Sequence, residues 1–83
     1  MRYHKSMSKF EKLKQKIRDG HSISYDEAEN FLLKIGFAVR VRGSHHVFSK
    51  DGYEKNISIK KRSQLMAYQM RLLEEVLEDE EKK

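Results

Sequence analysis

The spacing of the apolar residues changes along this chain of 83 residues, and the change marks two kinds of backbone. Phe31 and Ile35 are four positions apart, which places them on one side of a helix. Phe37, Val39 and Val41 instead alternate with other residues, which is typical of a strand with one buried face. The chain is therefore expected to combine helices with a sheet that is buried on one side.

Two helices are expected before this change. Residues 8–19 carry a narrow apolar stripe among lysines, and Gly20 follows in the position that ends many helices. Ser24 and Glu27 then form the Ser-x-x-Glu pattern of a capping box, in which each residue satisfies a free N–H group of the first turn. This pattern predicts a second helix over residues 25–35.

Three strands and a final helix are expected after it. The strands cover residues 37–42, 45–50 and 53–60, joined by a Gly-Ser turn and an Asp-Gly turn. Ser63 is a candidate cap for the last helix, and residues 1–7 and 79–83 are expected to fray. The expected inward stripe of that helix consists of Leu65, Met66, Gln69, Leu72, Leu73, Val76 and Leu77.

The predicted order is helix, helix, three-stranded antiparallel sheet, helix. We therefore expect one α+β domain over residues 1–83, with the helices laid on one face of the sheet. The helix-strand-strand-strand-helix part has the order of the double-stranded RNA-binding-domain fold, with an extra N-terminal helix. Since many functions share one fold, the function has to be argued from the site.

Charge is unevenly distributed along the sequence. Residues 1–62 hold 15 basic and seven acidic side chains, whereas residues 63–83 hold three and six. The basic part would attract a phosphate backbone, although a solvated lysine surface gives the same composition. The absence of cysteine excludes disulfides and thiolate metal sites. No apolar run approaches the roughly 18 residues that span a bilayer, so we expect a cytoplasmic protein without membrane contact.

The adjacent histidines His45 and His46 are the first candidates for chemistry. Neighbouring strand residues point to opposite faces, so the pair cannot bind one metal ion together, and we expect no metal and no cofactor. One histidine should face solvent and the other should pack towards the helices or the sheet edge. A solvent-facing imidazole between Arg40, Arg42, Lys50 and the Lys60–Arg62 connector could take the proton of an RNA 2′-hydroxyl. Alternatively, it only hydrogen-bonds RNA or caps the turn.

Two stretches of this sequence resemble the HicA family, the small mRNA-cleaving toxins of type II toxin–antitoxin pairs. They are LLKIGF at residues 32–37 and RGSHHVF at residues 42–48, and the similarity extends over roughly residues 8 to 77. The resemblance implies a ribonuclease that cuts mRNA, a double-stranded RNA-binding-like fold and a HicB-type antitoxin as partner. Many members have a proline and a histidine where this chain has Lys60, Lys61 and Arg62.

The resemblance also implies that a histidine of this strand is catalytic. His45 takes the third position of Gly-Ser-His, and His46 stays open as the alternative. The expected RNA and phosphate contacts are Arg40, Arg42, Gly43, Ser44, Lys50, Lys60, Lys61 and Arg62. Two other classes of function remain open, namely a non-catalytic RNA-binding module and a protein whose basic face binds an acidic partner.

Overall fold

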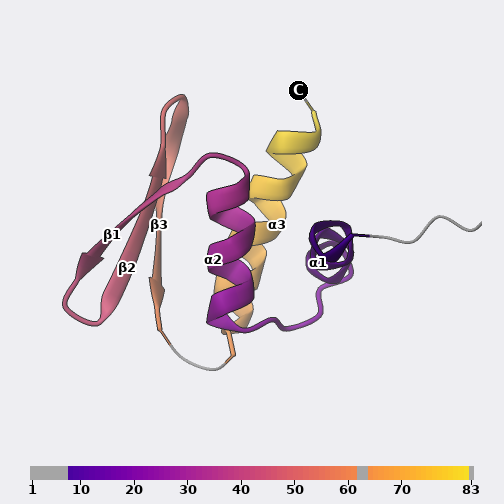
Figure 1. The fold of residues 1–83 in the computed structure, drawn as a ribbon, viewed down its shortest axis with the longest axis horizontal. Helices are drawn as coiled ribbons and strands as arrows, with labels where there is room; N and C mark the ends of the chain where they lie inside the picture. Colours follow the sequence, from indigo (N-terminus) through magenta and orange to yellow (C-terminus); the bar gives the residue numbers. More distant parts are fainter. Residues whose placement is uncertain (1–7, 62–63, 83) are drawn as a thin grey trace, which may run out of the picture.

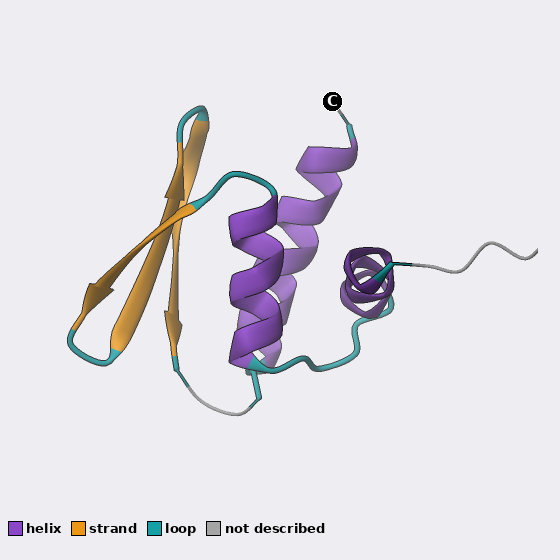
Figure 2. Cartoon of the chain, viewed as in Figure 1, coloured by secondary structure: helices purple, strands orange, loops and turns teal. Residues whose placement is uncertain are grey.

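The computed structural model describes residues 8–61 and 64–82, which form three helices and three strands (Figure 2). The expected order of the elements and the α+β class are confirmed. The elements are α1 (Lys9–Arg18), α2 (Tyr25–Lys34), β1 (Ala38–Arg42), β2 (His45–Lys50), β3 (Tyr53–Lys60) and α3 (Ala67–Glu81).

The strands form one antiparallel sheet in the order β1-β2-β3. Helices α2 and α3 lie side by side on one face of this sheet, and α1 lies beyond them, with its axis across theirs (Figure 1). No helix covers the other face in this view, so the sheet has one buried and one open face. Among the described residues, no helix has the length and hydropathy needed to cross a membrane.

Both N-terminal helices begin where the sequence predicts. Ser8 caps α1 by accepting the N–H of Glu11 at 3.1 Å. In α2, the hydroxyl of Ser24 accepts the N–H of Glu27, and the Glu27 carboxylate accepts the N–H of Ser24 at 3.0 Å. This reciprocal pair satisfies two N–H groups that have no partner within the helix. It fixes the start of the helix that supports the sheet.

The core lies between the sheet and the helices. Phe48 on β2 is opposite Ile57 on β3, and all three strand residues Phe48, Ile57 and Ile59 are buried. From the helices, Phe31 and Leu73 are fully buried in the same cluster. Since side chains alternate along a strand, burying these residues turns the intervening side chains to the open face.

Several details differ from the expectations. Val41 was expected in the core, but its side chain is 61% exposed because it lies near the outer end of edge strand β1. Met66, expected in the inward stripe of the last helix, is 48% exposed, whereas Met70 is buried. The last helix begins at Ala67 with Met66 at the N-cap position, so Ser63, which lies outside the described residues, does not adjoin it.

The acidic C-terminal segment belongs to the last helix. Helix α3 continues to Glu81 and so includes residues 79–81, which were expected to fray. Glu81 forms ion pairs with Arg18 and Lys14 of α1, and Glu80 pairs with Lys50 of β2. These contacts connect α3 to segments far away in the sequence.

Replacing Ser24 with alanine should lower the free energy of unfolding by about 1 kcal/mol, because the N–H of Glu27 loses its partner. Chemical denaturation, followed by circular dichroism, measures this change. Ser49→Ala is the matched control, since Ser49 is exposed on β2, and it should change stability by less than about 0.5 kcal/mol. Equal losses in both variants would contradict the capping role.

The same contact predicts a pH dependence. The N–H of Ser24 lowers the pKa of Glu27 below its usual 4.5, with a further contribution from Lys16. This stabilisation is complete above the pKa of the unfolded chain and is lost as the pH falls through the lower folded-state pKa. The Glu27→Gln variant should therefore lose less stability on acidification than the wild type in the same denaturation experiment.

Candidate nucleic-acid interface

The register of the sheet brings three polar side chains into one row on the open face. His45 of β2 lies opposite Arg42 of β1 on one side and opposite Lys60 of β3 on the other. Directly opposed residues share a face, with Cβ atoms about 5 Å apart. Arg40 follows two positions before Arg42 and therefore lies on this face as well. We call Arg40, Arg42, His45 and Lys60 the basic sheet face.

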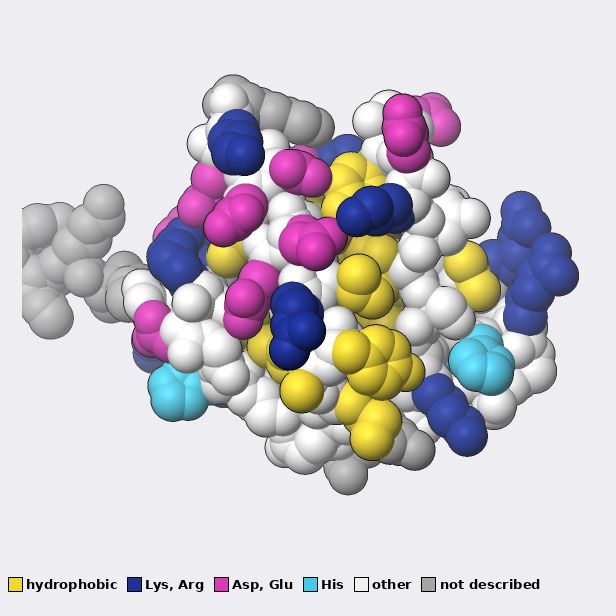
Figure 3. Space-filling view, turned by 180° about the vertical axis from the view of Figure 1, so that it is seen from behind, with side chains coloured by type: hydrophobic (Ala, Val, Ile, Leu, Met, Phe, Trp, Pro, Cys, Tyr) yellow, Lys and Arg dark blue, Asp and Glu magenta, His cyan; other side chains and the backbone are white. Residues whose placement is uncertain are grey.

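The cations of the basic sheet face differ from those on the helical side in their partners. Lys14, Lys16, Arg18, Lys50 and Lys55 each form an ion pair with a glutamate. Among the described residues, no such pair involves a member of the basic sheet face. Figure 3 shows acidic side chains mainly over the helices, with Lys, Arg and His side chains towards the edge of the sheet. The basic sheet face thus has positive charge available for an anion.

The two histidines lie on opposite faces, as expected. His45 is exposed, whereas His46 is half-buried on the face that carries Phe48. The ring of His46 packs against Tyr25 of α2, with 5.0 Å between the ring centroids. Neither the buried Nδ1 of His46 nor the Tyr25 hydroxyl has a hydrogen-bond partner within the described part of the chain. The exposed His45 is therefore the histidine that a large substrate can reach.

Tyr25 is the buried partner of His46 on the helix-facing side of the sheet. Burial raises the pKa of Tyr25 to about 12, with smaller contributions from Glu29 and Asp26, so its phenol is neutral at physiological pH. The contact between Tyr25 and His46 was not predicted from the sequence. The two residues are far apart in the chain, and no local pattern links them.

The β1–β2 turn sets the position of His45. Gly43 has a φ angle of +60°, a conformation that glycine adopts without the clash that a Cβ atom would cause. Gly43 and Ser44 are both exposed, next to Arg42 and His45. The turn therefore leaves its backbone and the Ser44 hydroxyl open to solvent beside the row of charged side chains.

Two other expected contacts, Lys50 and Lys61, do not join the basic sheet face. Lys50 is at the opposite end of β2 from His45, and its ammonium group pairs with Glu80 and lies 5.7 Å from the Phe37 ring centroid. Lys61 places its Nζ 5.8 Å from the ring centroid of Tyr25, on the side of His46. Arg62 lies outside the described residues. Lys50 was therefore wrongly grouped with His45, because its ion pair with α3 is not visible in the sequence.

The arrangement combines one exposed imidazole with cations that have no carboxylate partner. An imidazole can accept or donate a proton near neutral pH, and neighbouring guanidinium and ammonium groups can stabilise a phosphate that gains charge. Among residues 8–61 and 64–82, no group of three or more His, Asp or Glu side chains could hold a metal ion.

Comparison of the chain with protein-family models, with curated proteins and with solved structures finds no match.

The opposite environments of the two histidines predict opposite effects on stability. His46→Ala should lower the free energy of unfolding by about 1 to 2 kcal/mol, because it removes a ring packed against Tyr25. His45→Ala should change it by less than about 0.5 kcal/mol, since the side chain is exposed. Denaturation midpoints of the two variants measure the difference. A larger loss for His45→Ala would show that the two faces have been assigned in reverse.

Proposed function

We propose that this chain is an endoribonuclease of the HicA type, the toxin of a type II toxin–antitoxin pair that cuts mRNA without a metal ion. The observation that carries the proposal is the row in which exposed His45 lies between Arg42 and Lys60. The order from α2 to α3 is consistent with a double-stranded RNA-binding-like fold, with α1 as the additional helix.

The reaction we propose uses a nucleophile that RNA itself supplies. His45 takes the proton of a 2′-hydroxyl, whose oxygen then attacks the adjacent phosphorus. The bond from phosphorus to the 5′-oxygen breaks, the leaving oxygen takes a proton from water, and a 2′,3′-cyclic phosphate remains. Because the reacting groups belong to the substrate, an open basic surface is sufficient and no deep pocket is required.

The remaining members of the site have supporting roles in this proposal. Arg42 and Lys60 flank His45 and would stabilise the negative charge on the phosphate in the transition state. Arg40 would hold a neighbouring phosphate of the same strand. The exposed backbone of Gly43 and the hydroxyl of Ser44 would orient the phosphate beside the imidazole.

His45 rather than His46 has the catalytic role in this proposal, because the Nδ1 atom of His46 is buried beside Tyr25. A HicB-type antitoxin would neutralise the enzyme by covering the basic sheet face. That partner would have to supply carboxylates to Arg40, Arg42 and Lys60, or shield them from RNA.

The test is cleavage of a labelled single-stranded RNA by purified protein in the presence of EDTA. His45→Ala should cut at least about 100-fold more slowly than the wild type, as expected when a general base is removed. His46→Phe, which keeps an aromatic ring against Tyr25, is the matched control and should retain cleavage. RNA with 2′-O-methyl groups should not be cut, because its nucleophile is blocked.

The outcomes separate this proposal from its main alternative. Loss of cleavage with EDTA in the wild type would exclude the metal-independent mechanism, and full activity of His45→Ala would exclude the role of His45. A protein that binds the RNA but never cuts it, and whose binding survives His45→Ala, would instead be a non-catalytic RNA-binding module.

A further inference from the structure

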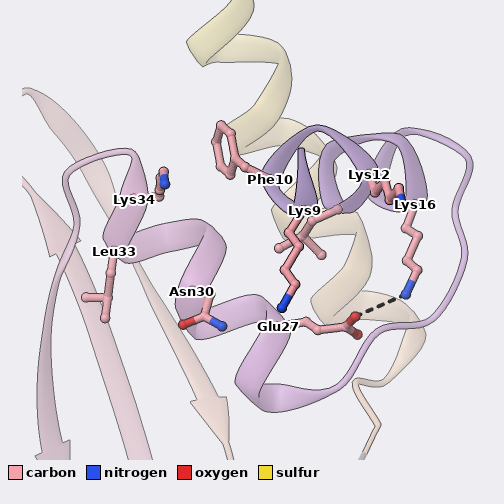
Figure 4. A pocket seen from close by; sticks show the side chains of 9 residues that line it. Lys9, Phe10, Lys12, Lys16, Glu27, Asn30, Leu33 and Lys34 are labelled. Carbon is pink, nitrogen blue, oxygen red and sulfur yellow. Dashed lines mark hydrogen bonds and ion pairs between the residues drawn. The ribbon is translucent and has the colours of Figure 1, made fainter. Parts of the chain in front are cut away.

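A second basic surface lies between α1 and α2, away from the open face of the sheet. It is an open groove of about 840 Å³, and Figure 4 shows its side chains projecting from both helices. Lys9 and Lys12 come from α1, and Leu33 and Lys34 come from α2. The sheet lies on the other side of α2 from α1 (Figure 1), so a short ligand of the basic sheet face would not reach this groove.

The groove has an excess of positive charge. Among the described residues that line it, the only carboxylate is that of Glu27, whose oxygen lies 3.0 Å from the ammonium nitrogen of Lys16, also at the groove (Figure 4). Within the described part of the chain, no ion pair involves Lys9, Lys12 or Lys34. These three lysines can therefore pair with carboxylates of a partner.

The groove also has an apolar component. Leu33 of α2, which is 43% exposed, and the half-buried Phe10 of α1 both line the groove. The Phe10 ring stacks on Phe31 at 6.1 Å, and the ammonium groups of Lys14 and Lys34 lie 5.3 and 5.6 Å from its centroid. Because Phe31 and two ammonium groups already lie against this ring, it is less suited to face-to-face stacking with a nucleic-acid base than to edge contact with an aliphatic side chain. Apolar anchors beside unpaired lysines are better suited to a peptide.

We propose that this groove binds an acidic amphipathic helix of a partner protein. Leucine-like side chains on one face of that helix would contact Leu33 and Phe10, and its carboxylates would pair with Lys9, Lys12 and Lys34. A groove between two helices that offers exposed apolar side chains is a common receptor for such a helix. This proposal does not depend on ribonuclease activity.

Segments of this chain itself are less suited to the groove than a helix of a partner protein. Residues 1–7 contain Arg2 and Lys5 and no carboxylate, so their charge is the same as that of the groove. In α3, Glu80 and Glu81 already pair with lysine and arginine side chains of their own chain. A second copy would have to break those pairs to offer the end of its acidic segment.

The experiment measures binding of a fluorescein-labelled helical peptide, built from leucine, glutamate and alanine, with leucine at positions i, i+3, i+4 and i+7. A peptide of the same composition with the leucines distributed around the helix is its control. Fluorescence anisotropy should show at least about tenfold tighter binding of the first peptide. Binding should weaken as salt is raised, because the ion pairs are exposed.

Substitutions in the full-length chain test whether the peptide binds in this groove. The double substitution Lys12→Glu and Lys34→Glu, and separately Leu33→Glu, should each weaken binding at least about tenfold. Arg71→Glu makes the charge change of one of these two lysine substitutions on an exposed residue of α3 outside this groove and should leave binding unchanged. His45→Ala should also bind normally, so the outcome of this test is independent of the cleavage test. Circular dichroism confirms that each variant is folded.

Amide chemical shifts in an NMR titration give the deciding observation. The amphipathic peptide should shift Lys9 and Leu33 and leave Arg42, His45 and Lys60 unchanged. Equal binding of the two peptides, or shifts confined to the sheet, would overturn the proposal. It would also fail if a single-stranded RNA bound the groove more tightly than the peptide, because the groove would then be a nucleic-acid site.

Discussion

The apolar contact between one face of the sheet and the helices α2 and α3 determines where the other groups lie. Phe48, Ile57 and Ile59 must be buried for so short a chain to form a core, and each strand alternates between its two faces. The requirement that places these residues inside also places His45 and its charged neighbours outside. The positions of the candidate-site residues therefore follow from the packing of the core and from the alternation of side chains along the strands.

The distribution of ion pairs gives the molecule two distinct basic surfaces. Most paired cations connect secondary-structure elements, as Arg18 does with Glu81 and Lys55 does with Glu75. Of the described cations without such pairs, Arg40, Arg42 and Lys60 lie on the open face of the sheet, and Lys9, Lys12 and Lys34 line the groove between α1 and α2. Since these surfaces lie on different sides of the helical layer, the proposed RNA and the proposed partner helix could be bound simultaneously.

Local patterns predicted most of the fold and the central part of the candidate site. Alternation was sufficient to separate His45 from His46, and the capping box was sufficient to place the start of α2 at Ser24. The errors concern contacts between distant segments and the ends of elements. Lys50 pairs with a glutamate 30 positions away, and Val41 is exposed near the end of β1, a strand at the edge of the sheet. A pattern within one segment contains no information about either.

An insertion or deletion in the β1–β2 turn can shift the pairing of β2, whose side chains alternate between the two faces of the sheet. A slip of β2 by one position would exchange the two histidines, so an imidazole would still occupy the open face. The same slip would move Phe48 from complete burial into water, which costs about 1.5 to 3 kcal/mol. The phenylalanine, and not the histidine, therefore fixes the pairing of this strand. After such a slip the two adjacent histidines would still place an imidazole on the open face, but the core would lose a buried phenylalanine.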